Sequence, residues 1–409
     1  MTAYDYDVVI VGSGPAGIGA ATALSRAGVK NIVVFDRETE IGGIPRHTHH
    51  ASFGLLVFKR PLKGPKYIRA LIKRCPDVQF QTSTTVTALH KDGIIEIATP
   101  DGMETIRARH IILATGARET PRHGRLTSGL RPQGVMTTGA LQQFVYGAKL
   151  RPFKRAVIVG TELVSFSALW TLRSAGIKPV AMIEENPRIT AYRPATLFAR
   201  LLRVPIHYNS QITDISGISE LREIRIGTHS GQHRTIACDG VIFSGKFVGD
   251  NNIARASHLT ESSTTQIPKV DQNWISSDPK VSIIGNAVHP ADMGDQCYIE
   301  GVSAGQTVAK ILQDGPDAGG IIEITHGKGI KMATPNILRP RQGESTSIDI
   351  SLHVAAPYTG TIVVKFEDEV IYAKSKRCMP ARRITLKNVT LNVTDSDPAH
   401  HIHISLADI

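Results

Sequence analysis

The chain has 409 residues, of which 41% are hydrophobic and 20% are charged, and its formal net charge is +11. This length exceeds one ordinary domain core, so we expect two or three domains. No stretch reaches the roughly 18 uninterrupted apolar residues that a membrane span needs, and the acidic amino-terminal segment does not resemble a signal peptide. We therefore expect a cytoplasmic protein, which would associate with a membrane only through a partner.

Cysteine content and charge limit the chemistry further. The four cysteines lie far apart without a CxxC pair, so the chain encodes neither a disulfide framework nor an iron–sulfur or zinc site, and we expect no metal. The positive charge fits an acidic partner, an anionic surface or an anionic substrate, although a solvated basic face is the simpler explanation. No recognisable nucleic-acid module accompanies the charge, and we expect no nucleic-acid partner.

An apolar run near the amino terminus leads into the sequence GSGPAG, in which Gly12, Gly14 and Gly17 form the complete GxGxxG pattern. An acid, Asp36, closes the next apolar run 19 residues after the third glycine. In this pattern the first glycine makes a tight turn, the second lets the backbone approach a pyrophosphate, and the third packs a helix closely on a strand. The sequence predicts a strand–turn–helix–strand unit that binds a dinucleotide, with its helix ending at Gly28.

A second copy of this unit follows at an offset of 148 residues, with Gly160, Glu162, Ser165 and Glu184 at the four corresponding positions. The spacing survives, but two of the three glycines do not. A carboxylate at Glu162 would block and repel the phosphates of a dinucleotide, so this second site is doubtful. Glu184 is placed like the ribose-binding acid of an NAD site and disfavours NADP, so binding of NAD(H) stays open.

The texture of the sequence changes once along the chain. Short strand-like runs alternate with helical patterns to about residue 315, which is typical of doubly wound α/β architecture. After a Gly/Asp/Pro stretch at 314–320, which we interpret as a linker, only strand-like runs follow. We expect two Rossmann-like α/β domains and a small all-β domain. The predicted boundaries are 1–150 with 240–315 for a discontinuous first dinucleotide domain, 151–239 for the second, and 318–409 for the all-β domain.

Five motifs occur in one order along the chain: VVIVGSGPAGIGAA, a double glycine at 42–43, IILATGAR, CDGVIFSGK and VSIIGNA. Together they resemble the two-dinucleotide-domain flavoproteins of the pyridine nucleotide-disulfide oxidoreductase-like superfamily, which includes thioredoxin reductase. The resemblance implies that the first unit binds FAD, with the glycine turn on the pyrophosphate and the acid on the adenosine ribose. The cofactor-binding residues that it implies are Gly12, Gly14, Pro15, Ala16, Gly17, Asp36, Arg37, Gly42, Gly43, Arg46, Thr115, Gly116, Gly285, Asn286 and Gly301. Asn286 stands where these flavoproteins usually have Asp, and an amide still accepts and donates hydrogen bonds.

The segment after the double glycine supplies the first catalytic candidates. Disulfide reductases of this superfamily carry a redox-active cysteine pair, which this chain lacks, so thiol–disulfide exchange is not expected as its main activity. Instead Arg46, His47, His49 and His50 cluster there, where the resemblance brings side chains towards the flavin. Imidazoles can relay protons or bind a substrate carboxylate. We expect Arg46 and His47 to be functional, whereas His49 and His50 are as well explained by a structural role.

Cys297 is a third catalytic candidate. It lies in the segment GDQCYIEG, where the resemblance places the amino terminus of a helix against the flavin, and we expect Glu300 and Gly301 to begin that helix. A helix amino terminus would lower the pKa of a nearby thiol. The alternative is that this lone cysteine is a small packed side chain.

Four other motifs are more specific: GGIPRH, ATGARETPR, GVMTTGALQQF and VIVGTELVSFSAL. They resemble the FAD subunits of multi-component dye-linked dehydrogenases, such as the B subunit of hydrogen cyanide synthase and the A subunit of octopine and nopaline oxidases. This resemblance implies an electron-transferring subunit, which acts on an amine, an amino acid or a related small molecule together with a second flavoprotein and an iron–sulfur subunit. Two alternatives stay open: a stand-alone NAD(P)H-dependent reductase of a protein or small acceptor, and a flavin-bound scaffold subunit.

Overall fold

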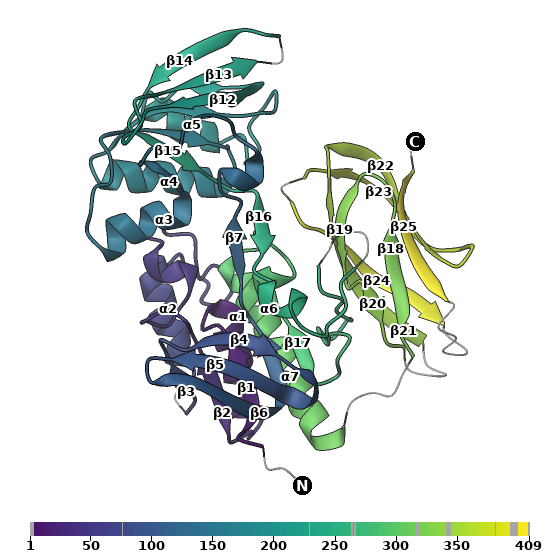
Figure 1. Cartoon of the computed structure of the whole chain (residues 1–409). Helices are drawn as coiled ribbons and strands as arrows, with labels where there is room; N and C mark the ends of the chain where they lie inside the picture. The colour runs from purple at the N-terminus through teal and green to yellow at the C-terminus, as the bar shows by residue number, and fades with distance from the viewer. Residues whose placement is uncertain are drawn as a thin grey trace. The chain divides into compact units, whose positions relative to one another are not determined.

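The chain forms two compact units in the computed structural model, which describes residues 4–407 apart from 76, 229, 263–264, 266, 316–319, 341–344, 381 and 393–399 (Figure 1). The first unit comprises Met1–Gly43, Arg69–Gly116 and Gly249–Ile409, and the second comprises Ile44–Ile68 and Ala117–Val248. Most of the predicted linker, residues 316–319, lies outside the described residues.

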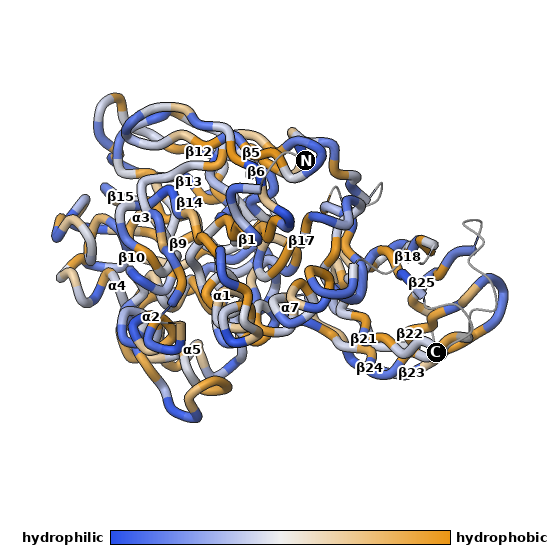
Figure 2. The backbone as a smooth tube through the Cα atoms, turned by 90° about the horizontal axis from the view of Figure 1, so that it is seen from below, coloured by the Kyte–Doolittle hydropathy of each residue, from blue (hydrophilic) through white to orange (hydrophobic). Residues whose placement is uncertain are grey.

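The first unit is built on a sheet in which the long strand β6 has two kinds of neighbour. Its second half pairs in parallel with β1 and β17, and its first half pairs antiparallel with β5. The strands in sheet order are β3 (Gln79–Gln81), β2 (Ile32–Phe35), β1 (Tyr6–Val11), β6 (Gly102–Leu113), β5 (Ile94–Thr99) and β4 (Thr85–Leu89), with β17 (Val281–Ile283) beside β6. Figure 2 shows hydrophobic residues along β1 and β17, and these strands are buried because helices or loops cover both faces of a parallel sheet.

Two helices of this unit, α1 (Pro15–Arg26) and α7 (Gly294–Asp314), pack closely through glycines. A Cβ atom on Gly19 would lie 2.3 Å from the carbonyl oxygen of Tyr298, and one on Gly301 would lie 2.0 Å from that of Ala16. The helix backbones therefore touch where ordinary side chains would hold them apart. The unit also contains α6 (Asn252–Arg255) and the 3₁₀ turns Lys91–Gly93 and Gly285–Ala287.

The second unit repeats the βαβ plan with a parallel sheet and adds an antiparallel one. The parallel strands in sheet order are β11 (Ile206–His207), β10 (Lys178–Ile183), β9 (Arg155–Val159), β15 (Gly240–Phe243) and β8 (Val135–Thr137). The antiparallel sheet consists of β12 (Ser210–Ser216), β13 (Glu223–Thr228) and β14 (His233–Ala237), and the short strands β7 (Ala117–Glu119) and β16 (Phe247–Gly249) form a separate pair. The helices are α3 (Thr138–Gln142), α4 (Leu163–Ser174) and α5 (Ala195–Leu201), with 3₁₀ turns at Ile44–His47 and His123–Arg125, while α2 (Gly64–Ile72) crosses from this unit into the first.

These boundaries differ from the predicted ones at both ends of the second domain. Strand β8 pairs with β15, and β15 pairs with β9, so residues 117–150 and 240–248 belong to the second unit and not to the first. Residues 44–68 join it as well. The difference arises because strand pairing, which decides the division, links segments more than 100 residues apart.

The carboxy-terminal strands form two sheets around one apolar core. One sheet has the order β20 (Ile337–Leu338), β18 (Ile322–His326), β25 (His401–Ala407), β22 (Tyr358–Phe366) and β23 (Glu369–Cys378), and the other has the order β19 (Ile330–Thr334), β21 (Ser345–Val354) and β24 (Ile384–Asn392). Alternate residues such as Ile350, Leu352 and Val354 in β21 are fully buried between the sheets. The segment predicted to contain only strands thus forms a β-sandwich, in which alternate residues along a strand point into the core between the two sheets.

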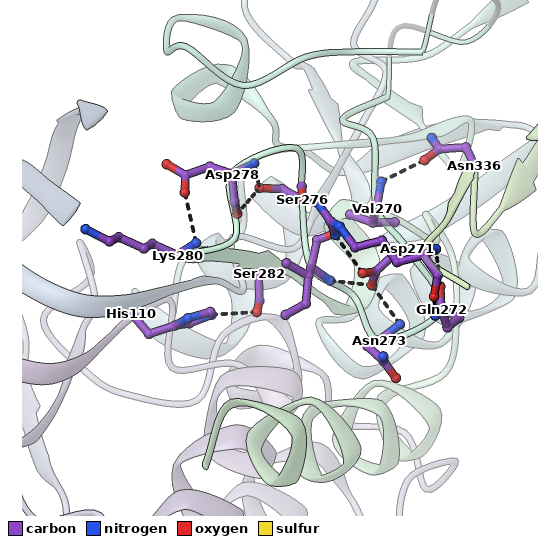
Figure 3. A network of polar contacts seen from close by, with 12 residues as sticks. His110, Val270, Asp271, Gln272, Asn273, Ser276, Asp278, Lys280, Ser282 and Asn336 are labelled. Atoms are coloured by element: carbon purple, nitrogen blue, oxygen red, sulfur yellow. Dashed lines mark hydrogen bonds and ion pairs between the residues drawn. The ribbon is translucent and has the colours of Figure 1, made fainter. Parts of the chain in front are cut away.

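Buried polar contacts attach this β-sandwich to the rest of the first unit. Asn336 accepts a hydrogen bond from Val270 N at 2.7 Å, and its own backbone N donates to Val270 O at 3.1 Å (Figure 3). The carboxylate of Asp271 accepts from Asn273 N and Ile275 N at 2.8 and 2.9 Å and pairs with the Arg339 guanidinium at 2.7 Å. The side chains of Asp271 and Arg339 are only 2% and 9% exposed, so this ion pair is removed from water.

Replacing Arg339 by Met is therefore expected to destabilise the protein by about 3–5 kcal/mol, because it leaves the Asp271 carboxylate buried without its cation. Burial already raises the pKa of Asp271, against the opposing effect of Arg339, and the substitution would raise that pKa further. The deficit relative to wild type should therefore grow as the pH rises through the acidic range and shrink as the carboxylate is protonated.

Urea unfolding measured at several pH values tests this expectation. The matched control is Arg255→Met, because Arg255 pairs with Glu261 at 3.1 Å but its side chain is 50% exposed, and its removal should cost at most about 1 kcal/mol. Equal effects of the two substitutions at neutral pH would contradict the assignment of Asp271 and Arg339 as a buried, structurally important pair.

Candidate functional site

The turn between β1 and α1 is shaped by contacts that exclude side chains. Gly12 has φ +107°, and a Cβ atom there would lie 2.4 Å from the carbonyl oxygen of Ala114. A Cβ atom on Gly17 would lie 1.9 Å from the carbonyl oxygen of Gly12. Only glycine therefore fits at these two positions of the turn.

Gly14 stands at the N-cap of α1 and has open space around it. A Cβ atom at this residue would meet nothing within 4 Å, and no side chain caps the helix. The first N–H groups of α1 are therefore available to an anion, which a helix amino terminus also attracts through its dipole. Gly116, with φ +77°, has open space as well, and Gly43 passes with its Cβ position 3.1 Å from the Cα of Gly14. The glycines thus form an open cradle that fits the pyrophosphate of FAD.

Asp36 is buried and fixed at the end of β2. Its carboxylate accepts hydrogen bonds from Ser13 N at 2.9 Å, from the Ser13 hydroxyl, and from Glu38 N at 3.0 Å. The Ser13 hydroxyl oxygen in turn accepts from Gly42 N at 2.9 Å. The acid is therefore positioned by the turn itself, through Ser13, which the sequence motif alone did not single out. Arg37 lies beside it, mostly exposed, and pairs with Asp250 at 3.4 Å.

The loop after β17 carries Gly285 and Asn286. Gly285 has φ +66°, its N donates to the Glu300 carboxylate at 2.7 Å, and a Cβ atom there would approach that of Ala16 to 2.7 Å. Asn286 accepts from Asp292 N at 2.9 Å and donates to Asp292 O at 3.3 Å. An ionised aspartate could not make the second bond, so the amide closes this loop in a way that the usual acid cannot.

Two candidates on α7 have a different explanation from the expected one. The helix begins at Gly294, so Glu300 and Gly301 lie in its second turn and do not begin it. The absence of a side chain at Gly301 is required by its contact with Ala16, and its contact with the flavin stays a prediction. Cys297 lies in the first turn but is buried, and burial together with Glu300 and Asp292 raises its pKa well above the ordinary value. Its thiol is therefore protonated, which favours the packing alternative over a reactive thiolate.

The segment with Arg46 and the histidines belongs to the second unit, where its members have separate environments. Arg46 and His47 end the 3₁₀ turn Ile44–His47, and His47 is buried. The ring of His49 stacks on Tyr146 with centroids 4.0 Å apart, and burial lowers its pKa, as do Lys149 and Lys63. Sequence reasoning missed Tyr146, which lies in the π-helical turn Gln143–Gly147, a rare conformation that is enriched at functional sites.

The contacts of His50, unlike those of His49, are with residues of its own segment. Its ring stacks on Phe53 with centroids 5.5 Å apart, and its Nδ1 lies 2.8 Å from the Ser52 hydroxyl. Burial lowers the pKa of His50, so its ring is neutral near pH 7. Within the described residues, no group of three His, Cys, Asp or Glu side chains is arranged to hold a metal ion.

The second unit repeats the hydrogen-bond frame of the first at the same offset. Gly160 N donates to Ile183 O at 2.8 Å, as Gly12 N does to Phe35 O. The Thr161 hydroxyl donates to the buried Glu184, which also accepts from Asn186 N at 2.9 Å. The residues Thr161, Glu184, Asn186 and Thr190 occupy the positions of Ser13, Asp36, Glu38 and Gly42. The turn is therefore preserved although its second and third glycines are lost.

Glu162 fills the place that is open in the first unit. It stands at the N-cap of α4, as Gly14 stands at that of α1, and its carboxylate accepts from Lys246 N at 2.9 Å. It lies so close to Gly245 that a Cβ atom there would be 2.3 Å from the carboxyl carbon. The Glu162 carboxylate thus lies against the loop after β15, and the residue stands where the first unit has an open glycine.

A buried acid and an arginine complete this closed arrangement. Glu119 accepts from Gly245 N at 3.0 Å and from Gly139 N at 2.8 Å, and burial raises its pKa. Arg125 donates to the carbonyl oxygens of Ser244 and Gly245 at 2.9 Å and faces both Glu162 and Glu119. The loop after β15 therefore has its amides and carbonyls satisfied within the protein. Sequence reasoning missed Glu119 and Arg125, since neither belongs to the glycine pattern.

A cavity of about 520 Å³ lies in the second unit beside the carboxyl ends of β8 and β15. Arg122 lines it and donates to the carbonyl oxygens of Thr127, Ser128 and Gly129 at 3.1, 3.0 and 2.7 Å. Its guanidinium is therefore committed to holding the loop, and burial and Arg131 lower its pKa. We assign no ligand to this cavity.

Comparison with known proteins identifies the family. Residues 6–309 match the family model described as pyridine nucleotide-disulphide oxidoreductase, and the chain belongs to this family, which binds FAD and NAD(P)H. The fold is similar to that of thioredoxin reductase from T. acidophilum, with a TM-score of 0.62 and 20% identity over 75% of this chain and 99% of that one. The prediction of a thioredoxin-reductase-like α/β fold with a carboxy-terminal strand-rich domain is confirmed.

Two curated relatives come from Rhizobium meliloti (strain 1021). The A subunit of opine oxidase is 26% identical over 181 residues, 44% of this chain and 38% of its own length. The alpha subunit of sarcosine oxidase is 23% identical over 345 residues, 80% of this chain and 33% of its own length. The chain thus spans well under half the length of each of these relatives, and both names are those of oxidase subunits, as the narrower sequence resemblance predicts.

Replacing Gly14 by Glu is expected to abolish FAD binding while leaving the fold intact. Gly14 has ordinary helical-entry backbone angles, φ −68° and ψ 179°, and its Cβ position is open, so a side chain costs the apoprotein little. A carboxylate there would oppose the phosphates, as Glu162 does in the second unit. Flavin absorbance per chain and FAD titration of the apoprotein give the measurement.

Gly14→Ala is the matched control and should retain FAD with weakened affinity, since it adds volume without charge. Thermal unfolding of both apoproteins should match that of wild type. Full flavin content in Gly14→Glu would show that residue 14 does not face the pyrophosphate.

Proposed function

We propose that this chain is the electron-transferring FAD subunit of a heteromeric dehydrogenase or oxidase that acts on an amine, an amino acid or a related small molecule. The observation that carries the proposal is the contrast between the two nucleotide sites. The first is an open cradle of glycines at a helix amino terminus, and the second is filled by the carboxylate of Glu162. A chain that receives its electrons from a partner needs FAD but does not need a nicotinamide.

The cysteines support a chemistry other than disulfide reduction. Cys75, Cys238, Cys297 and Cys378 are all free and buried in the structure. Burial raises the pKa of each thiol, to about 12 for Cys238. Thiol–disulfide exchange requires a thiolate, so none of these side chains is prepared to act as its nucleophile.

FAD, when bound, accepts a hydride and passes on single electrons, and the chain's residues would hold it for this purpose. The amides at the start of α1 would bind the pyrophosphate, and Asp36, fixed by Ser13, would face the adenosine ribose. The Gly285–Asn286 loop would reach the ribityl chain and the flavin. Arg46 and His47 are proposed to bind an anionic group or to move a proton, whereas Cys297 is not proposed to take part.

The names of the relatives support the partners that we propose. The matched chains of opine oxidase and sarcosine oxidase are by name subunits of larger oxidases. We propose a second flavoprotein subunit that oxidises the substrate, together with an iron–sulfur subunit that carries electrons onward. An iron–sulfur centre would reside on the partner, because this chain's four cysteines are too scattered to bind one. Among the described helices none has the length and hydropathy to cross a membrane.

One observation favours a second candidate function, a stand-alone NADH-dependent reductase. The second unit keeps the hydrogen bonds of the turn that run through Thr161, and a buried acid, Glu184, at the position of Asp36. Movement of the Glu162 side chain alone would reopen its helix amino terminus. The two functions therefore differ in whether NADH reduces the flavin directly.

Anaerobic titration of the flavin-loaded protein with NADH, and then NADPH, separates the two functions. We expect the visible flavin band of wild type to persist, because Glu162 excludes the dinucleotide. In Glu162→Gly we expect NADH to bind at least tenfold more tightly and to bleach the band. Glu162→Gln is the matched control, which keeps the bulk and removes the charge, and it should give an intermediate result.

Rapid bleaching of the wild-type protein by NADH would overturn the subunit proposal in favour of the reductase. With a stable oxidised flavin, the next measurement is dye reduction by the chain mixed with a co-purified flavoprotein partner and its amine or amino-acid substrate. Failure of that mixture to reduce this chain's flavin would favour the scaffold alternative.

A further inference from the structure

One charged side chain of the β-sandwich, Arg383, contacts the loop after β17, which carries Gly285 and Asn286 and is called the flavin-type loop below. Arg383, directly before β24, pairs with the Asp292 carboxylate at 2.5 Å, and its Nε donates to the Ser351 hydroxyl at 2.8 Å. The side chains of Arg383 and Asp292 are 25% and 7% exposed. The pair is therefore largely shielded from solvent and salt, and it is fixed at both ends.

Asp292 passes this contact on to the loop after β17. Its backbone N and O are both bonded to the side chain of Asn286, at 2.9 and 3.3 Å. The residue before Asn286, Gly285, donates its N to Glu300 at 2.7 Å. Arg383 is thus connected, through its ion pair with Asp292 and the two hydrogen bonds between Asp292 and the Asn286 side chain, to the residues that we propose to face the flavin.

Ionisable groups surround this connection on both sides. They are His289, Asp292, Cys297 and Glu300 from the nucleotide-binding part, and His353 and Arg383 from the β-sandwich. Lys331 of the sandwich faces His353. His289 Nε2 lies 3.7 Å from the Glu300 carboxylate, and these two side chains are 3% and 7% exposed.

Among these groups, Arg383 is the cation that offsets the negative charge of the acids Asp292 and Glu300. Burial raises the pKa of Glu300 to about 7 and also raises that of Asp292, and Arg383 opposes both shifts. Burial and Arg383 lower the pKa of His289 well below its ordinary value, and burial lowers that of His353. Of the six groups, Arg383 is therefore the one with a positive charge at neutral pH. Two-electron reduction would add negative charge beside a loop that already has the Asp292 carboxylate and the partly ionised Glu300 behind it.

We propose that Arg383 of the carboxy-terminal β-sandwich is a positioning residue of the flavin site, which holds the Gly285–Asp292 loop through Asp292 and stabilises the reduced flavin by its charge. The β-sandwich is then a part of the redox site and not an independent appendage. This inference rests on the proposed FAD site in the first unit, and it concerns the potential and affinity of the cofactor, not the source of its electrons.

The midpoint potential of FAD in the full-length protein tests this inference, with FAD affinity of the apoprotein as a second readout. Arg383→Met should lower the equilibrium constant for two-electron reduction about tenfold at pH 7, which is a shift of about −30 mV. Asp292→Asn should shift the potential in the opposite direction, because it leaves the cation unopposed. A merely structural contact would move both variants the same way.

Two further variants control for charge and for folding. Arg383→Lys should keep the potential close to that of wild type while FAD binds more weakly, since Lys retains the charge but loses the fork to Asp292 and Ser351. Arg377→Met, on an exposed arginine of β23 in the same sandwich, should change neither quantity. If Arg383→Met fails to fold, a positive shift in Asp292→Asn together with a wild-type potential in Arg383→Lys still supports the role of the charge, and an unshifted potential in Asp292→Asn overturns it.

The outcomes separate this inference from the proposed function. Equal potentials in wild type, Arg383→Met and Asp292→Asn, with FAD bound, would overturn the role of Arg383 and leave the FAD site standing. Shifts of the same sign in the two variants would also overturn it. A wild-type chain that binds no FAD would overturn the FAD site and this inference together.

Discussion

The contact between Gly17 and the carbonyl oxygen of Gly12 determines the geometry on which the rest of the candidate site depends. A Cβ atom at Gly17 would lie 1.9 Å from that oxygen, so the turn closes only with glycine, and its closure aims the first amides of α1 at the open space around Gly14. Ser13, inside the same turn, then fixes Asp36 and Gly42 by hydrogen bonds. One steric constraint thus positions the helix amino terminus, the acid and the double glycine together.

The second unit shows that this framework and its ligand are separable. Its turn keeps corresponding hydrogen bonds through Thr161 and Glu184, yet a carboxylate, Glu162, stands where the first unit has Gly14. The Arg125 guanidinium faces the buried Glu119 and the half-buried Glu162, and its positive charge offsets the charges of these carboxylates. The unit thus keeps the architecture of a nucleotide-binding domain although residues of its turn have changed.

The β-sandwich is joined to the nucleotide-binding part of the first unit by two separate sets of buried charges. Asp271 and Arg339 fasten one end of the connection, and Asp292 and Arg383 lie beside the flavin-type loop. Buried ion pairs are an expensive means of attachment, because each charge must be desolvated. They do, however, fix one arrangement, and at Asp292 they also place a cation where a redox cofactor can respond to it.

The sequence by itself determined the features that depend on local spacing: two glycine-based turns at a fixed offset, the replacement of glycine by Glu162, and the change to strands alone near residue 315. It also indicated the family, since these motifs occur in one order. Tertiary structure decided the rest. The assignment of 117–150 to the second unit depends on the pairing of β8 with β15. The packing role of Gly301 depends on the crossing of α1 and α7. The raised pKa of Cys297 depends on its burial beside Glu300. Arg383 and Asp292 are 91 positions apart, and no local pattern reports a contact that only the folded chain creates.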